Sequence, residues 1–177
     1  MARNDRAQHK RVVIEADGGS RGNPGPAAYG AVLKDADTGE VIAEDASTIG
    51  VASNNVAEYS GLIAGLRLAE EFAPGADVEV RMDSKLVVEQ MSGRWKIKHA
   101  SMRPLAMEAN RLAPSGTTYT WMPREQNTHA DRLANEALDG KRNGVTTPDD
   151  ADDPSLIEEI EDPAPGPGAG PSRGWGL

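Results

Sequence analysis

The chain has 177 residues and a formal net charge of −9, and only 4% of its residues are aromatic, so aliphatic side chains must supply most of a core. The absence of cysteine excludes disulfides, thiolate metal sites and thiol nucleophiles, and three scattered histidines are too few for a zinc site. The first ten residues lack an apolar signal core and no apolar run approaches the roughly 20 residues of a membrane span, so we expect a soluble, cytoplasmic protein with no membrane partner.

The negative charge is concentrated near the C-terminal end. From residue 148 onward there are eight acidic residues and one arginine, so this segment carries −7 and the rest of the chain −2. The acidic composition is therefore compatible with a local basic patch, and with a nucleic-acid partner, on the remainder of the chain.

The first half of the chain predicts three strands before its first long helix. Residues 1–10 are typical of a flexible lead, and residues 11–16 predict a strand rich in β-branched side chains. A dense turn cluster follows at residues 17–26, and the strand patterns at 28–34 and 40–49 predict an antiparallel hairpin.

A long helix and a second strand–helix pair come next. Capping residues at 53–55 precede a helical pattern at 56–72. A strand at 78–82 then leads into a helix at 85–91, which is followed by a basic, tryptophan-bearing connection at 93–101.

The chain then predicts one more helix, a strand and a final helix. A helix begins at Pro104, a β-prone strand spans residues 117–122, and Asn127 and Thr128 cap a last helix that stops near Gly140. The order of elements predicts an α/β fold with a five-stranded mixed sheet. Three of its strands would be antiparallel and the others parallel, with helices on both faces.

The composition divides the chain into one domain and two flexible ends. We expect the domain to span residues 11–142, after the lead at residues 1–10. Residues 143–177 are first acidic and then Pro/Gly-rich, which is typical of a disordered tail or linker.

Four acidic residues stand at boundaries between the predicted elements. Asp17 and Asp83 each end an apolar strand pattern, while Glu58 and Asp131 lie near the starts of helices. Taken singly, each has a structural explanation, because Asp favours turns and acids favour the first turn of a helix. Together they indicate a cluster, since α/β sheets usually place their sites at such strand ends.

The expected proximity of Asp17 and Asp83 favours a metal site. Two like charges about 4 Å apart repel by about 4 kcal/mol at an effective dielectric constant of about 20, a cost that no turn or cap requires. A divalent cation removes this repulsion, and an all-oxygen cluster suits hard cations such as Mg²⁺. Without metal, we expect one carboxylic acid of the cluster to have a raised pKa.

Four ordered motifs carry a resemblance to a known family. The chain reads DGGSRGNPGP from Asp17, SNNVAE from Ser53, MDS from Met82 and ADRLAN from Ala130. Over residues 11–140 these motifs closely resemble type 1 ribonuclease H, which implies the ribonuclease H-like fold. The resemblance also implies an endonuclease that cuts the RNA strand of an RNA–DNA hybrid and leaves 5′-phosphate and 3′-hydroxyl ends.

The resemblance implies a catalytic metal centre as well. One Mg²⁺ would activate the attacking water and a second would stabilise the leaving 3′ oxygen, with Mn²⁺ as a substitute for Mg²⁺. The family's four catalytic, metal-binding acids correspond to Asp17, Glu58, Asp83 and Asp131.

Further residues acquire substrate roles from the resemblance. Asn23, Ser53, Asn54 and Asn55 would contact the sugar-phosphate backbone and 2′-hydroxyls of the hybrid, although Ser53 and Asn54 also suit helix capping. Lys85 stands where some relatives carry a substrate-binding glutamine. In the basic connection, contacts with the DNA strand are expected of Arg94, Trp95, Lys96 and Lys98.

One loop departs from the family pattern. Many relatives carry a histidine after the last strand, which is thought to assist product release or protonation. This chain has Glu125 at the corresponding place. His129 lies nearby and could substitute, although an exposed histidine beside a helix cap is the simpler interpretation.

Two other functions remain open beside an active hybrid nuclease. One is a non-catalytic hybrid-binding module, in which the acids only cap helices and turns. The other is a DNA-directed nuclease of the same fold, against which the asparagines suited to 2′-hydroxyls argue. We expect a monomer, and the tail resembles linkers that lead to an acid phosphatase domain in actinobacterial relatives. The chain itself contains no phosphatase motif.

Overall fold

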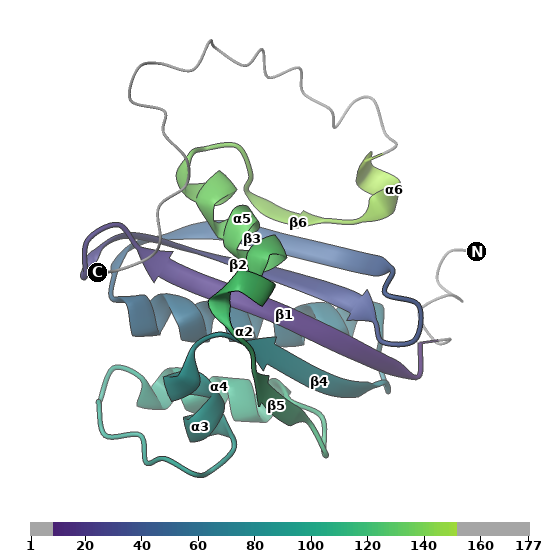
Figure 1. Ribbon diagram of the computed structural model, residues 1–177, viewed down its shortest axis with the longest axis horizontal. Coiled ribbons are helices and arrows are strands. Elements are labelled where there is room, and N and C mark those ends of the chain that lie inside the picture. The colour runs from purple at the N-terminus through teal and green to yellow at the C-terminus, as the bar shows by residue number, and fades with distance from the viewer. Residues whose placement is uncertain (1–8, 152–177) are drawn as a thin grey trace.

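Strand β1 (Arg11–Ser20) lies near the centre of the sheet in the computed structural model, which describes residues 9–151 (Figure 1). It pairs antiparallel with β2 (Gly25–Asp35), and β2 pairs antiparallel with β3 (Val41–Ala52). These three long strands form the antiparallel part of the sheet and confirm the predicted hairpin.

The other part of the sheet is parallel. Strand β4 (Asp77–Met82) pairs with β1, and β5 (Thr118–Trp121) pairs with β4. The short strand β6 (Gly144–Thr146) adds antiparallel to the outer edge of β3. The order β5-β4-β1-β2-β3-β6 confirms the predicted mixed α/β sheet and adds a sixth strand to the expected five.

The sequence prediction of the first turn was too wide. Residues 17–20 continue β1 and residues 25–26 begin β2, so only residues 21–24 lie between the two strands. The small residues of this segment pair along the ladder, as Gly19 does with Ala28. At Gly18 a larger residue would not fit, because a Cβ atom there would lie 2.1 Å from the carbonyl oxygen of Ala57.

The ordered fold also continues past residue 142, where the sequence predicts the domain to end. Strand β6 and the short helix α6 (Pro148–Ala151) both follow that boundary. A strand of three residues is too short to give a periodic signal in the sequence. The predicted lead at residues 1–8 and the predicted tail at residues 152–177 lie outside the described residues.

Three helices cover one face of the sheet and one crosses the other (Figure 1). Helices α2 (Asn54–Phe72), α3 (Lys85–Met91) and α4 (Arg103–Leu112) pack on the first face, while α5 (Thr128–Leu138) packs over β2 and β3 on the second. This arrangement confirms the prediction of helices on both faces. Within residues 9–151, no helix is long and apolar enough to cross a membrane.

The alternation of side chains along β2 divides the core in two. Ala31 and Leu33 belong to the main cluster with α2, whereas Ala28 and Val32 face α5. The cluster beneath α5 is much smaller than the main one, and its buried members are Ala28, Val32, Ala46, Leu133 and Ala137. Helix α5 is therefore held by less apolar surface than α2.

Gly30 of β2 allows α5 to come close to the sheet. A Cβ atom at this position would lie 2.3 Å from the carbonyl oxygen of Ala130 and 2.8 Å from Cβ of Leu133. No side chain fits there unless the helix moves, so the backbone of α5 packs directly on the strand.

Gly30→Ala is expected to destabilise the fold by about 1–3 kcal/mol, because the added methyl group must push α5 away from β2. Thermal or urea unfolding measures this change. Val51→Ala serves as the control, since Val51 is 74% exposed on β3. A Gly30→Ala protein as stable as the wild type would show that α5 does not pack this tightly.

Candidate active site

Asp17 and Asp83 come from neighbouring parallel strands. In the ladder between β1 and β4, Ala16 pairs with Met82, so the next residues along the two strands are Asp17 and Asp83. Strand β4 ends at Met82, whereas β1 continues past Asp17, which is only 2% exposed. The two acids therefore lie at the carboxyl end of the parallel pair, where α/β sheets usually place their sites.

Glu58 approaches this pair from helix α2. Ser53 caps the helix, and its hydroxyl oxygen accepts the N–H of Val56 at 3.2 Å, so Glu58 lies in the second turn. Gly18 allows the helix to approach β1, since a Cβ there would lie 2.1 Å from the carbonyl oxygen of Ala57. With the backbones this close, Oε1 of Glu58 accepts the N–H of Gly18 at 2.9 Å.

Three of the four predicted acids converge at this point. Asp17, Glu58 and Asp83 each offer a carboxylate oxygen, and these oxygens all lie within 4.8 Å of one another. Asp131, on α5, is not part of this group. Its charge nevertheless contributes to the raised pKa of Asp17, so it lies within electrostatic range of the cluster.

Burial and mutual repulsion raise the pKa values of the converging carboxyl groups. The pKa of Asp17 is well above its usual range, first because the group is buried and then because of the neighbouring acids. Burial, followed by the charge of Asp83, raises the pKa of Glu58 to about 8, and burial also raises the pKa of Asp83. At neutral pH the metal-free cluster therefore retains protons.

The donor set fits a hard divalent cation. All of the converging side-chain donors are carboxylate oxygens, which suit Mg²⁺ and Mn²⁺. A bound cation would offset the repulsion between them, and it would displace the protons that the raised pKa values retain. The residues present thus fit the metal that the sequence resemblance implies.

Asn127 supports this arrangement, and the sequence analysis missed this role. Its fully buried side chain donates from Nδ2 to the carbonyl oxygen of Ala16 at 2.9 Å and to Oδ1 of Asp83 at 3.4 Å. The sequence predicts it as a helix cap, but its side chain makes no capping bond with α5. An asparagine that caps a helix and one that turns into the core look alike in a single sequence.

Arg124 is the second site residue that the sequence analysis missed. Its Nε atom lies 4.0 Å from Oδ2 of Asp83, and its charge opposes the rise in pKa at Glu58 and Asp83. It belongs to the short helix η1 (Arg124–Gln126). It lines an open pocket of about 220 Å³ whose other walls are Asp17, Gly18, Asn54, Glu58 and Asp83.

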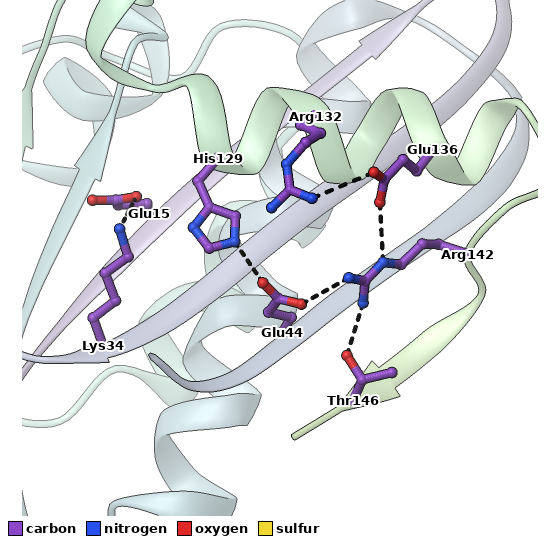
Figure 2. Close-up of polar contacts among 8 residues, drawn as sticks. All are labelled: Glu15, Lys34, Glu44, His129, Arg132, Glu136, Arg142 and Thr146. Atoms are coloured by element: carbon purple, nitrogen blue, oxygen red, sulfur yellow. Dashed lines mark hydrogen bonds and ion pairs between the residues drawn. The ribbon is translucent and has the colours of Figure 1, made fainter. Parts of the chain in front are cut away.

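The two predicted auxiliary residues do not lie beside the acids. Glu125 follows Arg124 in η1 but is exposed and does not line the pocket. His129 faces β3, where its Nε2 atom contacts Oε2 of Glu44 (Figure 2). Of these three residues, only Arg124 lines the pocket of the acids, and an auxiliary role of Glu125 or His129 stays a prediction.

The polar residues at the start of α2 hold the turn between β1 and β2. Oδ1 of Asn54 accepts from the backbone N–H and the hydroxyl of Ser20, at 2.9 and 3.0 Å. Oδ1 of Asn23 in turn accepts the N–H of Asn54 at 3.1 Å. Ser53 caps the helix and Asn55 is exposed. Their contacts with a substrate stay predictions.

The basic connection borders a second pocket, of about 520 Å³, beside α3. Its walls include the four predicted residues of the connection, Arg94, Trp95, Lys96 and Lys98. Arg94 pairs with Glu89, and the ring of Trp95 is 46% exposed. The ammonium group of Lys85 lies 5.7 Å from the centre of the Trp121 ring. Substrate contacts of these residues also stay predictions.

Asp17→Asn is expected to stabilise the metal-free protein, and more so at about pH 8 than at about pH 5. Folding raises the carboxyl pKa values, so the native state binds more protons than the unfolded state and stability falls as pH rises through this range. Removing one charge should raise the free energy of unfolding by about 1–2 kcal/mol near pH 8, which corresponds to an increase in Tm of roughly 3–8 °C. Thermal unfolding in a chelator measures the change.

The control for this prediction is Asp77→Asn, because Asp77 is exposed at the opposite end of β4. If Asp17→Asn changed the stability no more than Asp77→Asn did at both pH values, repulsion among the buried acids would not be a cost to the metal-free protein.

Asn127→Ala is expected to destabilise the protein by about 1–3 kcal/mol, because the carbonyl of Ala16 then loses its buried donor. Urea unfolding measures the difference from wild type, with the exposed Asn55→Ala as the matched control. Equal stability of the two variants would mean that the hydrogen bond of the buried amide contributes nothing to the stability of the protein.

Comparisons with known sequences agree with this geometry. A family model described as reverse transcriptase-like matches residues 15–137. The bifunctional protein Rv2228c of Mycobacterium tuberculosis is 53% identical over 93% of this chain, which spans only 43% of that protein. Ribonuclease HI of Halobacterium salinarum is 47% identical over 73% of this chain and 65% of its own length.

Solved structures show the same similarity. The N-terminal RNase H domain of Rv2228c, fused to maltose binding protein, matches with a TM-score of 0.70 at 59% identity, covering 75% of this chain and 96% of that chain. LC11-RNase H1, in complex with an RNA/DNA hybrid, matches with a TM-score of 0.70 at 38% identity, covering 73% of this chain and 98% of that chain. With the fold, the acid cluster and these relatives in agreement, the chain belongs to the ribonuclease H family.

Proposed function

We propose that this chain hydrolyses the RNA strand of RNA–DNA hybrids in a metal-dependent reaction that leaves 5′-phosphate and 3′-hydroxyl ends. The observation that carries the proposal is the convergence of Asp17, Glu58 and Asp83, whose carboxylate oxygens lie within 4.8 Å of one another. Membership of the ribonuclease H family supplies the reaction class. The chain spans less than half of the mycobacterial relative, so the proposal concerns the ribonuclease H domain.

The acids are suited to hold the metal ions that this reaction needs. Bound Mg²⁺, or Mn²⁺ in its place, supplies an activated water and charge stabilisation at the leaving oxygen. Two such ions would be held by Asp17, Glu58, Asp83 and Asp131. The N–H of Gly18 and the amide of Asn127 orient two of these carboxylates before metal enters, and the protons kept by the raised pKa values leave as it binds.

Arg124 is placed to bind a phosphate of the substrate. Its side chain is 47% exposed and lies 4.0 Å from Asp83, a distance too long for a hydrogen bond between the two groups. Its guanidinium donors can therefore turn to phosphate oxygens, which they bind in a forked geometry.

The polar residues around the two pockets support a hybrid as the substrate. Asn54 lines the pocket of the acids, and Asn23 is bonded to it. These amides are close enough to the reaction site to contact 2′-hydroxyls, the groups that distinguish RNA from DNA. The second pocket suits the backbone and bases of the DNA strand, because it combines cations with an exposed ring in Arg94, Trp95, Lys96 and Lys98.

Asp83→Asn is expected to lower hybrid cleavage by on the order of a hundred-fold or more, because it removes a metal-binding carboxylate. Labelled RNA–DNA hybrid, double-stranded RNA and double-stranded DNA are incubated with and without Mg²⁺. Asp77→Asn should cleave as the wild type does, since the same change then lies at the exposed, opposite end of β4. Hybrid that stays uncut with both Mg²⁺ and Mn²⁺ would refute the proposal.

The same assay separates the two other functions. A non-catalytic module would bind hybrid in a salt-sensitive way without turnover, and Mg²⁺ would not stabilise it. A DNA-directed nuclease would cut the DNA duplex. The buried repulsion among the acids favours catalysis over simple capping, because a capping residue does not require several charges in one place.

A further inference from the structure

Helix α5 carries Asp131 but rests on a small apolar contact. The apolar cluster between it and the sheet has the buried members Ala28, Val32, Ala46, Leu133 and Ala137, with Val41 and Leu138 packed against them, and the other buried apolar residues of the helix are the small Ala130 and Ala134. Alanines bury little apolar area, so this cluster contributes less to holding its helix than the main core contributes to holding α2. Polar contacts at the edge of α5 therefore matter for where the helix sits.

Arg142 makes such contacts to three elements at once (Figure 2). Its Nε atom donates to Oε1 of Glu136 on α5 at 3.0 Å, and its Nη1 atom donates to the hydroxyl of Thr146 on β6 at 2.9 Å. Its Nη2 atom lies 3.1 Å from Oε1 of Glu44 on β3. We call these four residues, Arg142, Glu44, Glu136 and Thr146, the Arg142 clasp.

His129 adds a second link between β3 and α5. Its Nε2 atom contacts Oε2 of Glu44, the carboxylate oxygen that Arg142 leaves open (Figure 2). The bond from His129 and the charge of Arg142 together lower the pKa of Glu44. His129 and Glu136 stand on either side of Asp131 in the chain, so the sheet edge holds α5 both before and after that acid.

The clasp is better shielded from water than an ordinary surface ion pair. The side chains of Glu44, Arg142 and Glu136 are 15%, 25% and 27% exposed, whereas Arg111 in its pair with Glu108 is 66% exposed. Shielded pairs are screened less by salt, and removing one partner leaves the other charge without its counter-ion in a poorly hydrated place. A planar guanidinium can serve three acceptors in fixed directions, which a lysine ammonium cannot do in the same way.

We infer that Arg142 is a positioning residue, which links α5 to β3 and β6 and so keeps Asp131 within electrostatic range of the other active-site acids. The inference rests on the proposed function, because it takes Asp131 as a metal ligand. Asp131 is carried by α5 and is not among the acids that converge within 4.8 Å. A movement of α5 would therefore change the distance between Asp131 and the other acids. Arg142 lies beyond residues 15–137, which match the family model.

Other contacts hold the remaining sides of α5, which limits the expected effect. Asn127 ties the start of the helix to Ala16, and Arg21 contacts Asn135 and Asp139 near its end. Loss of the clasp should therefore loosen the helix without detaching it.

Arg142→Gln tests the inference, with Arg111→Gln as the matched control on α4. We expect backbone hydrogen exchange in residues 128–138 to become about threefold to tenfold faster, while exchange in α2 stays unchanged. The Mn²⁺ concentration at half-saturation should rise by about threefold to tenfold. For Arg142→Lys, both the exchange rate and the Mn²⁺ concentration at half-saturation should lie between those of the wild type and of Arg142→Gln. If Arg142→Gln does not fold, Arg142→Lys is used in its place. Exchange and affinity equal to those of the control would overturn the inference.

A double-mutant cycle with Asp131→Asn separates positioning from general destabilisation. Mn²⁺ binding is measured by calorimetry, so the readout does not depend on turnover. If Arg142 acts through Asp131, Arg142→Gln weakens Mn²⁺ binding when Asp131 is present and has no further effect when Asp131 is replaced. An equal loss in both backgrounds would overturn the inference.

Hybrid cleavage by the same proteins keeps the two conclusions apart. A wild-type chain that binds Mn²⁺ but leaves hybrid uncut would refute the proposed function while the exchange result still decides the role of the clasp. Normal cleavage with unchanged exchange in Arg142→Gln would refute the clasp alone.

Discussion

Repulsion among carboxylates that the fold forces together is the constraint on which the rest of the site depends. Two ionised carboxylates about 4 Å apart would repel by about 4 kcal/mol at an effective dielectric constant of about 20, and retained protons, reflected in the raised pKa values, remove part of this cost. The fold imposes this proximity because β1 and β4 are parallel neighbours in register, and because Gly18 lets α2 pack against β1. Donors from Gly18 and Asn127 offset part of the cost, and cations can offset the rest.

The two unequal cores give the four acids unequal support. Asp17, Glu58 and Asp83 stand on β1, α2 and the end of β4, which share the large apolar cluster. Asp131 stands on α5, which the smaller cluster and a set of polar contacts hold against the other face. We therefore expect the placement of Asp131 to respond differently from that of the other three acids to temperature, salt or substitution.

Much of this organisation could be predicted from the sequence, because periodic apolar patterns and four motifs mark the central strands, the helices and the acids. What the sequence could not predict depends on tertiary contacts. Residues 17–20 look like a turn until β2 is paired beside them. Asn127 and His129 both look like residues at a helix start, yet the first turns into the core and the second faces Glu44. Arg124 lies beside the acids because the loop after β5 folds back toward them, and no local sequence pattern indicates that path.

Metal binding coupled to proton release tests the central claim most directly. Mg²⁺ is titrated calorimetrically into the metal-free protein near neutral pH, in two buffers with different ionisation enthalpies. We predict that Mg²⁺ binds and that the measured heat differs between the buffers, because the carboxyl groups with raised pKa values release protons as the ion enters. Absence of binding, or identical heats in the two buffers, would contradict a buried carboxylate cluster that keeps its protons until metal arrives.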